Sequence, residues 1–353
     1  MTMNATEKAE HRWWSALVPL PGGLLSSLAQ QAEAQGIHGL FATQVHGAPF
    51  STLAAAAVGT RRIQLATGIA IASARSPFET AMTAMDLDRI SEGRFILGLG
   101  ASSISWTRGM HGVPDRKPLT GLKETVRAVR YIVGNAHKGL EPFRGEYYRA
   151  DFREFQPTPP PVRESIPIWT AALRQRAVCA AGEVSDGLIG HPMWSIDWAE
   201  QMVRTELPKG LERSGRARKD IHINLWIWTA LSDDPAQAIQ DARGTVAFYA
   251  GLAQYQPYFE AHGFGEEAQQ VQEPITRGDL ATATQLVPDD MVRTFVAAGS
   301  EDQVRAYLAR AWDVADSICL VPPTWGLDPE TVFSYQARVA ELMARDGPGS
   351  RPS

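Results

Sequence analysis

The sequence predicts an α/β protein whose parallel strands close into a barrel, the (β/α)8 or TIM-barrel architecture. Short apolar runs alternate with longer amphipathic runs along nearly the whole chain. Eight of the short runs have the length and composition of strands, and at least one helical stretch separates each from the next. Such strands pair in parallel, because a parallel crossover needs about the length of a helix. Eight such units fit a closed barrel with loop insertions better than an open sheet.

The eight predicted strands are rich in β-branched or other apolar residues. The run IQLATGIAI is apolar on both faces, which is typical of a strand that is buried on both sides. The strands are expected at residues 15–20, 39–43, 63–71, 94–100, 168–171, 187–190, 222–231 and 317–321.

Amphipathic stretches between these runs predict the helices. Several begin with ordinary start signals, such as Ser76 followed by Pro77, or Ser300 before an acidic first turn. Helices are expected at residues 24–35, 51–59, 77–90, 120–133, 174–184, 198–214, 235–249, 301–314 and 329–344.

The chain has 353 residues, about 100 more than a typical barrel of this class. We interpret the surplus as two insertions in a single domain that spans residues 1–353. One insertion covers about 102–167 and contains the stiff run PTPPP, and the other covers about 250–288, where the periodicity is weak. The tail GPGSRPS, residues 347–353, is expected to be disordered.

The composition restricts the class of protein. With 44% hydrophobic residues the chain is not a disordered or fibrous protein. With 34 Lys and Arg against 39 Asp and Glu its net charge is −5, which argues against nucleic acid or an anionic membrane as partner. Two separated cysteines make a disulfide framework or zinc cluster improbable. We find no signal peptide and no apolar segment of about 18 residues, so a cytoplasmic protein is expected.

Five candidate residues fall on the expected rim of the barrel, where the carboxyl ends of the strands carry the active site. His46 and His191 follow the second and sixth predicted strands, where an imidazole serves as acid, base or cofactor contact. The alternative is an ordinary polar surface residue. Trp106, Trp194 and Trp325 could line an apolar pocket, although ten tryptophans in the chain make some rim tryptophans expected.

The segment from Ala171 to Arg174 passes from a strand into a helix start. Free backbone N–H groups, the helix dipole and the cations of Arg174 and Arg176 favour a phosphate there. The run GLG at residues 98–100 lacks the third glycine of a dinucleotide-binding loop. The eight histidines do not cluster at the spacing of metal ligands, so no metal site is predicted.

Two long runs resemble the luciferase-like monooxygenase superfamily, whose members are flavin- or F420-dependent oxidoreductases on a TIM barrel. They are LAAAAVGTRRIQLATGIAIASARSPFETAMTAMDLDRISEGRFILGLG, residues 53–100, and IPIWTAALRQRAVCAAGEVSDGLIGHP, residues 166–192. Downstream, AFYAGLAQYQPYFEAHGF and VPDDMVRTFVAAGSEDQV are similar to an actinobacterial F420-dependent subgroup.

The resemblance implies roles for particular residues. A non-prolyl cis peptide at Gly68–Ile69 would lie behind the flavin or deazaflavin ring, and Thr43 and Gln44 would meet the ring edge. It also implies that the chain forms a homodimer. The phosphate contacts would be Ala171, Ala172, Leu173 and Arg174, with Gly187 and Leu188 close by.

The sequence also departs from the family. Sugar-oxidising F420 enzymes carry an Asp-His pair after the second strand and a glutamate after the fourth, whereas this chain has Gln44-Val45 and Ser103. The Glu-His-His run of many FMN-dependent members is absent too. Sugar dehydrogenation is therefore disfavoured, and His46 stands one residue beyond the missing pair.

The sequence hypothesis is a hydride transfer between reduced F420 and a small apolar organic substrate. Ser103, Trp106 and Trp194 would line the substrate pocket, and His46 or His191 would deliver the proton. Four arginines are candidates for the anionic tail of F420, namely Arg174, Arg176, Arg61 and Arg62. One alternative is an FMN-dependent monooxygenase that forms a flavin peroxide with oxygen. The other is a cofactor-free or non-catalytic barrel that only binds.

Overall fold

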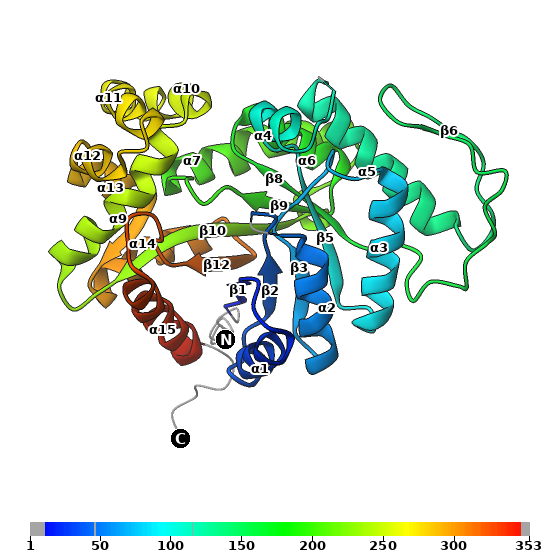
Figure 1. Cartoon of the computed structure of the whole chain (residues 1–353), viewed down its shortest axis with the longest axis horizontal. Helices are drawn as coiled ribbons and strands as arrows, with labels where there is room; N and C mark the ends of the chain where they lie inside the picture. The colour runs from blue at the N-terminus through cyan, green and yellow to red at the C-terminus, as the bar shows by residue number, and fades with distance from the viewer. Residues whose placement is uncertain (1–10, 46, 115, 347–353) are drawn as a thin grey trace, which may run out of the picture.

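A computed structural model describes residues 11–45, 47–114 and 116–346. Eight parallel strands close into a barrel, so the predicted (β/α)8 fold is confirmed (Figure 1). In ring order the strands are β1 (Trp13–Leu17), β2 (Gly39–Ala42), β3 (Gln64–Thr67), β5 (Phe95–Gly100), β8 (Ile168–Ala172), β9 (Gly187–Gly190), β10 (His222–Leu231) and β12 (Ser317–Val321). β12 pairs with β1 and closes the ring.

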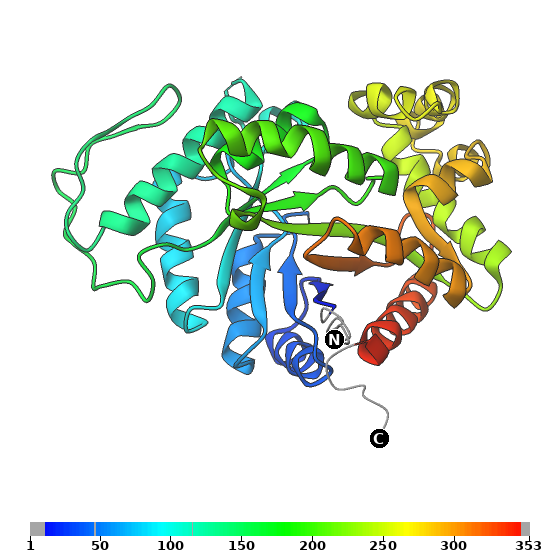
Figure 2. The ribbon, with the colours of Figure 1, turned by 180° about the vertical axis from the view of Figure 1, so that it is seen from behind.

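Helices cover the outside of the barrel, as Figures 1 and 2 show from opposite sides. Most begin at signals visible in the sequence: Ser76 and Ser300 accept hydrogen bonds from backbone N–H groups of the first turns that follow them. The helices around the ring are α1 (Gly22–Ala34), α2 (Pro49–Gly59), α3 (Pro77–Ile90), α5 (Pro118–Asn135), α6 (Gln175–Val184), α7 (Ile196–Gln201), α8 (Leu207–Arg213), α9 (Pro235–Ala250), α13 (Asp289–Phe295), α14 (Glu301–Trp312) and α15 (Pro329–Asp346). A π-helical turn, Met202–Glu206, joins α7 to α8.

The structure adds one strand to the main sheet that the sequence pattern did not reveal. β11 (Val296–Gly299) follows α13 directly, without a glycine or proline to mark the change. It pairs in parallel with the carboxyl half of β10, beyond the point where β9 ends. The predicted strand at 63–71 is also interrupted: β3 and β4 (Ala70–Ile71) are separated by Gly68 and Ile69.

The two segments interpreted as insertions contain regular structure. Residues 102–167 hold α4 (Ile104–Gly109), α5 and a hairpin of β6 (Phe143–Arg144) and β7 (Arg149–Ala150). Because α5 packs against α3 and α6, it belongs to the ring of barrel helices. Residues 250–288 hold a 3-10 turn, Ala253–Tyr255, and the helices α10 (Gln256–Glu260), α11 (Gly265–Thr276) and α12 (Leu280–Gln285). In Figure 1, α10 and α11 lie at the upper edge, on the same side as α4.

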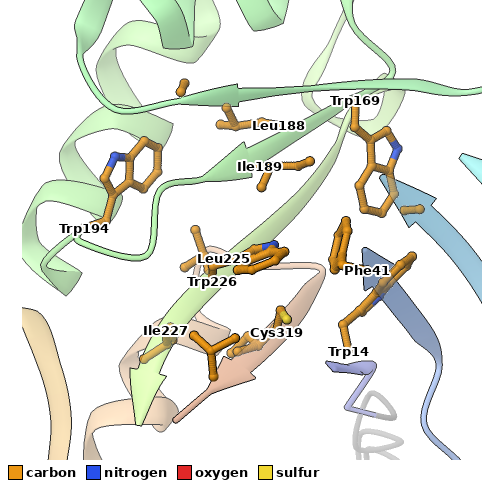
Figure 3. Packing of buried hydrophobic residues seen from close by; sticks show 14 of the residues in the cluster. Trp14, Phe41, Trp169, Leu188, Ile189, Trp194, Leu225, Trp226, Ile227 and Cys319 are labelled. Atoms are coloured by element: carbon orange, nitrogen blue, oxygen red, sulfur yellow. The ribbon is translucent and has the colours of Figure 1, made fainter. Parts of the chain in front are cut away.

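Aromatic side chains fill the interior of the barrel (Figure 3). The ring of Trp14 lies 4.4 Å from that of Phe41 and 5.3 Å from that of Trp169, and Phe41 lies 5.0 Å from Trp226 between ring centroids. Gly39 makes this packing possible, because a Cβ there would lie 2.5 Å from the Trp14 ring. The interior is therefore a packed core, and a ligand can bind only above it.

His222 lies at the amino end of its strand, where the sequence suggested a structural role. Its ring stacks on Trp169 at 4.7 Å, and its Nε2 lies 2.7 Å from Ser317 Oγ. Both contacts belong to the base of the barrel, away from the rim.

Candidate active site

The carboxyl ends of the strands meet at one end of the barrel, and most of the predicted site residues lie there. Thr43 and Gln44 follow β2, Gly68 and Ile69 link β3 to β4, Ser103 and Trp106 follow β5, Ala171, Ala172, Leu173 and Arg174 end β8, and His191 and Trp194 follow β9. His46 lies outside the described residues. Residues from five separate segments of the chain thus share one rim.

Four of the proposed cofactor contacts lie at the other end of the barrel, where the strands begin. Gly187 and Leu188 begin β9, and Gly187 sits directly beneath the Trp169 ring. Arg61 and Arg62 precede β3, and Arg61 pairs with Glu92 at 3.8 Å. The structure places all four at the amino ends of the strands, away from Arg174, because a strand's first residues and its carboxyl rim lie at opposite ends of a barrel. We therefore remove them from the candidate site.

Gly68 and Ile69 form the part of the rim that sits directly on the aromatic core. The peptide bond between them is cis, as the family resemblance implies. A Cβ on Gly68 would lie 2.6 Å from ring atoms of both Phe41 and Trp226. Only glycine therefore fits at this position without displacing the rings below it.

Gln44 connects two loops of the rim. Its Oε1 accepts a hydrogen bond from the Ile71 backbone N–H at 2.9 Å and lies 3.4 Å from Arg75 Nη1. The Arg75 guanidinium lies 5.0 Å from the centroid of the Phe50 ring. Since the Gln44 oxygen is occupied, the side-chain NH2 is the group left to contact a ligand.

The start of α6 carries two exposed cations. Arg174 is the N-cap residue and Arg176 lies in the first turn, and no side chain caps this helix. In the described part of the chain neither guanidinium has an acidic partner or a hydrogen bond. Unsatisfied N–H groups and the positive helix end favour an anion here, and the phosphate site stays a prediction.

Trp194 supports this segment and does not face an open pocket. It is 4% exposed, and its Nε1 donates to the Leu173 carbonyl at 2.9 Å. Trp198 Nε1 donates to the same oxygen at 3.0 Å. The two indoles hold the chain just before Arg174, so we replace the predicted pocket-lining role of Trp194 with a positioning role.

Ser103 and Trp106 belong to the short helix α4. Ser103 is its N-cap, and its Oγ accepts from the Trp106 backbone N–H at 3.2 Å. Beside α4 is a small pocket that is partly open to solvent. Its lining residues are Ala72, Ser73, Ala101, Ser102, Ile104, Thr107, Pro114, Arg116, Pro118, Gly121, Leu122 and Thr125. Neither Ser103 nor Trp106 lines this pocket.

His191 has both ring nitrogens engaged. The Met193 backbone N–H donates to Nδ1 at 3.2 Å, and Nε2 lies 3.0 Å from the Tyr255 hydroxyl oxygen. Burial lowers the pKa of His191 to about 3, so the ring is neutral at pH 7. A neutral ring with two partners is poorly suited to deliver a proton by itself.

Two tyrosines that the sequence analysis did not select surround His191, and the predicted rim residue Trp325 packs behind them. Tyr249 packs edge-on against it at 5.4 Å, and Tyr255 lies at 5.6 Å. Trp325 is 5.6 Å from Tyr249 and 5.5 Å from Trp228. The tyrosines come from the end of α9 and the 3-10 turn after it, so a search limited to residues after strands passes over them. The sequence feature that could have pointed to these tyrosines is the aromatic run FYAGLAQYQPY, which lies within a segment that resembles the family.

Two further properties bear on the class of protein. Within the described ranges, no group of three or more His, Cys, Asp or Glu is placed to hold a metal ion. None of the helices there combines the length and the apolar character that a membrane crossing requires.

Comparisons with known proteins show the family of the chain. The family model described as luciferase-like monooxygenase matches residues 24–315. An uncharacterised protein of Mycobacterium tuberculosis is 30% identical over 300 residues, which is 82% of this chain and 88% of that protein. The 5,10-methylenetetrahydromethanopterin reductase of Methanolobus tindarius is 27% identical over 296 residues, 82% of this chain and 87% of the reductase.

Solved structures share the fold. The F420-dependent tetrahydromethanopterin reductase of Methanopyrus kandleri superposes with a TM-score of 0.80 at 24% identity, over 97% of this chain and 100% of that one. A type II Baeyer–Villiger monooxygenase of Pseudomonas putida in complex with FMN superposes with a TM-score of 0.66 at 16% identity. The superposition covers 97% of this chain and 99% of the monooxygenase chain. The family match over most of the chain identifies the protein as an oxidoreductase that belongs to the luciferase-like monooxygenase family.

Proposed function

We propose that this oxidoreductase binds F420 at the carboxyl rim and transfers a hydride between the deazaflavin and a small uncharged organic substrate. The observation that carries the proposal is the pair of unpaired cations, Arg174 and Arg176, at the start of α6. F420 has a phosphate and a long anionic tail, whereas FMN ends in one phosphate. Two cations in addition to a helix start therefore favour the more highly charged cofactor.

The residues present fit such a cofactor. The α6 start with Arg174 would hold the phosphate, and Arg176 would lie toward the tail. Gly68 and Ile69 would support the ring from below, and the Gln44 amide would meet its edge. When bound in reduced form, F420 supplies a hydride. The protein orients ring and substrate and keeps water away from them.

The proposal is tested by titrating the apo protein with F420 and, separately, with FMN, following the quenching of cofactor fluorescence. We expect tighter binding of F420. Tighter binding of FMN would overturn the proposal in favour of the FMN-dependent monooxygenase, which the FMN-bound structural neighbour keeps as the second candidate. The non-catalytic barrel is no longer a candidate, because the chain belongs to a family of oxidoreductases.

Charge reversal at the α6 start should weaken this binding. We expect Arg174→Glu to raise the Kd for F420 about 10- to 100-fold, since a charge-assisted hydrogen bond contributes about 1.5–3 kcal/mol. Arg62→Glu is the matched control: Arg62 is also exposed but lies at the amino end of β3. Equal Kd values for Arg174→Glu and Arg62→Glu would contradict a phosphate site at the start of α6. Titration at raised salt should narrow the difference in Kd between the wild type and Arg174→Glu.

A further inference from the structure

The hydrogen bonds around His191 fix the position of its single proton. The Met193 backbone N–H can only donate, so Nδ1 accepts and carries no hydrogen. A neutral imidazole has one N–H, which must then be on Nε2. Nε2 lies 3.0 Å from the Tyr255 hydroxyl oxygen, and His191 is consequently the donor to Tyr255.

The Tyr255 hydroxyl therefore accepts one hydrogen bond and still has its own proton to give. Among the described residues this proton has no acceptor. Burial raises the pKa of Tyr255, so the phenol keeps its proton at neutral pH. The chain from Met193 N–H through His191 to Tyr255 polarises the hydroxyl toward donation, because hydrogen bonds in series strengthen one another.

The surroundings of this hydroxyl are aromatic. Tyr249 lies 5.4 Å from Tyr255, and burial raises its pKa as well. Phe248 stacks on Trp325 at 4.3 Å, and Trp325 packs edge-on against Tyr249. Arg174 is the charged group whose field reaches Tyr255. Aromatic faces beside a free hydroxyl proton favour a flat, uncharged ligand group with one oxygen that accepts a hydrogen bond.

We propose that the Tyr255 hydroxyl donates a hydrogen bond to the carbonyl oxygen of the substrate, that His191 positions this hydroxyl, and that Tyr249 and Trp325 hold the flat apolar part beside the carbonyl. The substrate class is thus an uncharged aromatic or conjugated carbonyl compound. The assignment rests on the proposed function only in treating this rim as the place where the substrate reacts.

The test uses acetophenone labelled with 13C at the carbonyl as the probe, with the full chain and without F420. Its Kd is measured by ligand-observed NMR, and its carbonyl stretch by infrared difference spectroscopy. For Tyr255→Phe we expect a Kd about tenfold higher and a carbonyl band at higher wavenumber, because one neutral hydrogen bond is lost. Tyr307→Phe is the control, since that hydroxyl bonds the Thr294 carbonyl on the outer helices. Unchanged band and Kd in Tyr255→Phe, or no binding of acetophenone by the wild type at millimolar concentration, would overturn the proposal.

The positioning role of His191 has its own readout. His191→Gln can still donate from its amide nitrogen to Tyr255, whereas His191→Leu cannot. We expect the carbonyl band to stay near the wild-type position in His191→Gln and to move to the Tyr255→Phe position in His191→Leu. The imidazole 15N spectrum should show the Nε2–H tautomer, with an Nε2 shift that changes in Tyr255→Phe. A wild-type Nδ1–H tautomer would contradict the assignment.

The same variants separate this inference from the proposed function. Tyr255→Phe and His191→Gln are titrated with F420 alone, where we expect Kd values within about twofold of the wild type. If F420 does not bind but the acetophenone band depends on Tyr255, the cofactor proposal fails and the carbonyl site stands. If F420 binds and the band does not depend on Tyr255, only the carbonyl site fails.

Discussion

Replacing Arg94 by methionine is expected to lower the free energy of unfolding by about 3–5 kcal/mol, because it removes a buried donor that satisfies several backbone acceptors. Arg94 is 8% exposed and begins the segment that enters β5. Its Nη2 donates to the carbonyls of Ala57 and Thr60 at 3.0 and 3.1 Å, and its Nη1 to Ile63 O at 2.9 Å. The guanidinium therefore caps the carboxyl end of α2 and ties it to the neighbouring strand.

Methionine keeps much of the apolar stem of Arg94 but leaves these carbonyls without a partner in the interior. The loss is measured by urea denaturation followed by tryptophan fluorescence and circular dichroism. Arg153→Met is the control: that side chain is 85% exposed and pairs only with Asp151, so we expect a change within about 0.5 kcal/mol. Because Arg94 lies at the base, the F420 affinity of the folded variant should stay at the wild-type value. A stability loss no larger than that of Arg153→Met would show that the carbonyls find other partners.

The contrast between β3 and β11 shows what a sequence pattern can reveal of this fold. The run around β3 is long, apolar and β-branched, so its burial inside a parallel barrel was predictable. β11 has four small residues and follows α13 without a break. Neither an alternation of apolar and polar residues nor a turn residue therefore marks it as a strand. Its pairing with β10 depends on where β9 ends, which is a property of the closed barrel and not of the local sequence.

The candidate site shows a similar division. Arg174 and His191 were predictable because the rule that sites follow barrel strands needs only the strand ends. Tyr255 was not, because it reaches the rim from a 3-10 turn after α9. Trp194 was predicted on the rim but with the wrong role, since only the structure shows its N–H bonded to Leu173. Gly187 was assigned from the resemblance alone, and the strand register places it at the base.

Acidification should destabilise the protein strongly, most of all through the half-buried His191 and His222. Burial lowers the pKa of His191 to about 3 and that of His222 to about 4. In the unfolded chain a histidine titrates near 6.5. Both imidazoles are thus neutral in the folded protein and protonate more readily in the unfolded chain. Their contribution to the free energy of unfolding is therefore complete above about pH 6.5 and is lost as the pH falls toward their folded-state pKa values.

The expected loss is about 1.4 kcal/mol per pH unit for each histidine, or roughly 3 kcal/mol each between pH 7 and 4. Urea denaturation at a series of pH values measures it. His222→Gln can keep a hydrogen bond to Ser317 while removing the titration of His222, and should reduce the loss of stability between pH 7 and 4 by about 3 kcal/mol. His111→Gln, at an exposed position, should leave the curve unchanged. A His222→Gln curve parallel to the wild type would contradict the burial argument.

The pH dependence of the free energy of unfolding also decides how acid can affect the candidate active site. Losing about 6 kcal/mol by pH 4 matches the whole stability of a domain at the lower end of the typical 5–15 kcal/mol and about 40% of it at the upper end. For a stability near the lower end, we expect the fold to open before His191 is protonated inside it. Substrate binding and the circular dichroism signal should then fall together on acidification, with no separate step near pH 6.5. A binding step near pH 6.5 with an intact fold would mean that His191 titrates freely, and would remove the basis for treating it as the fixed, neutral partner of Tyr255.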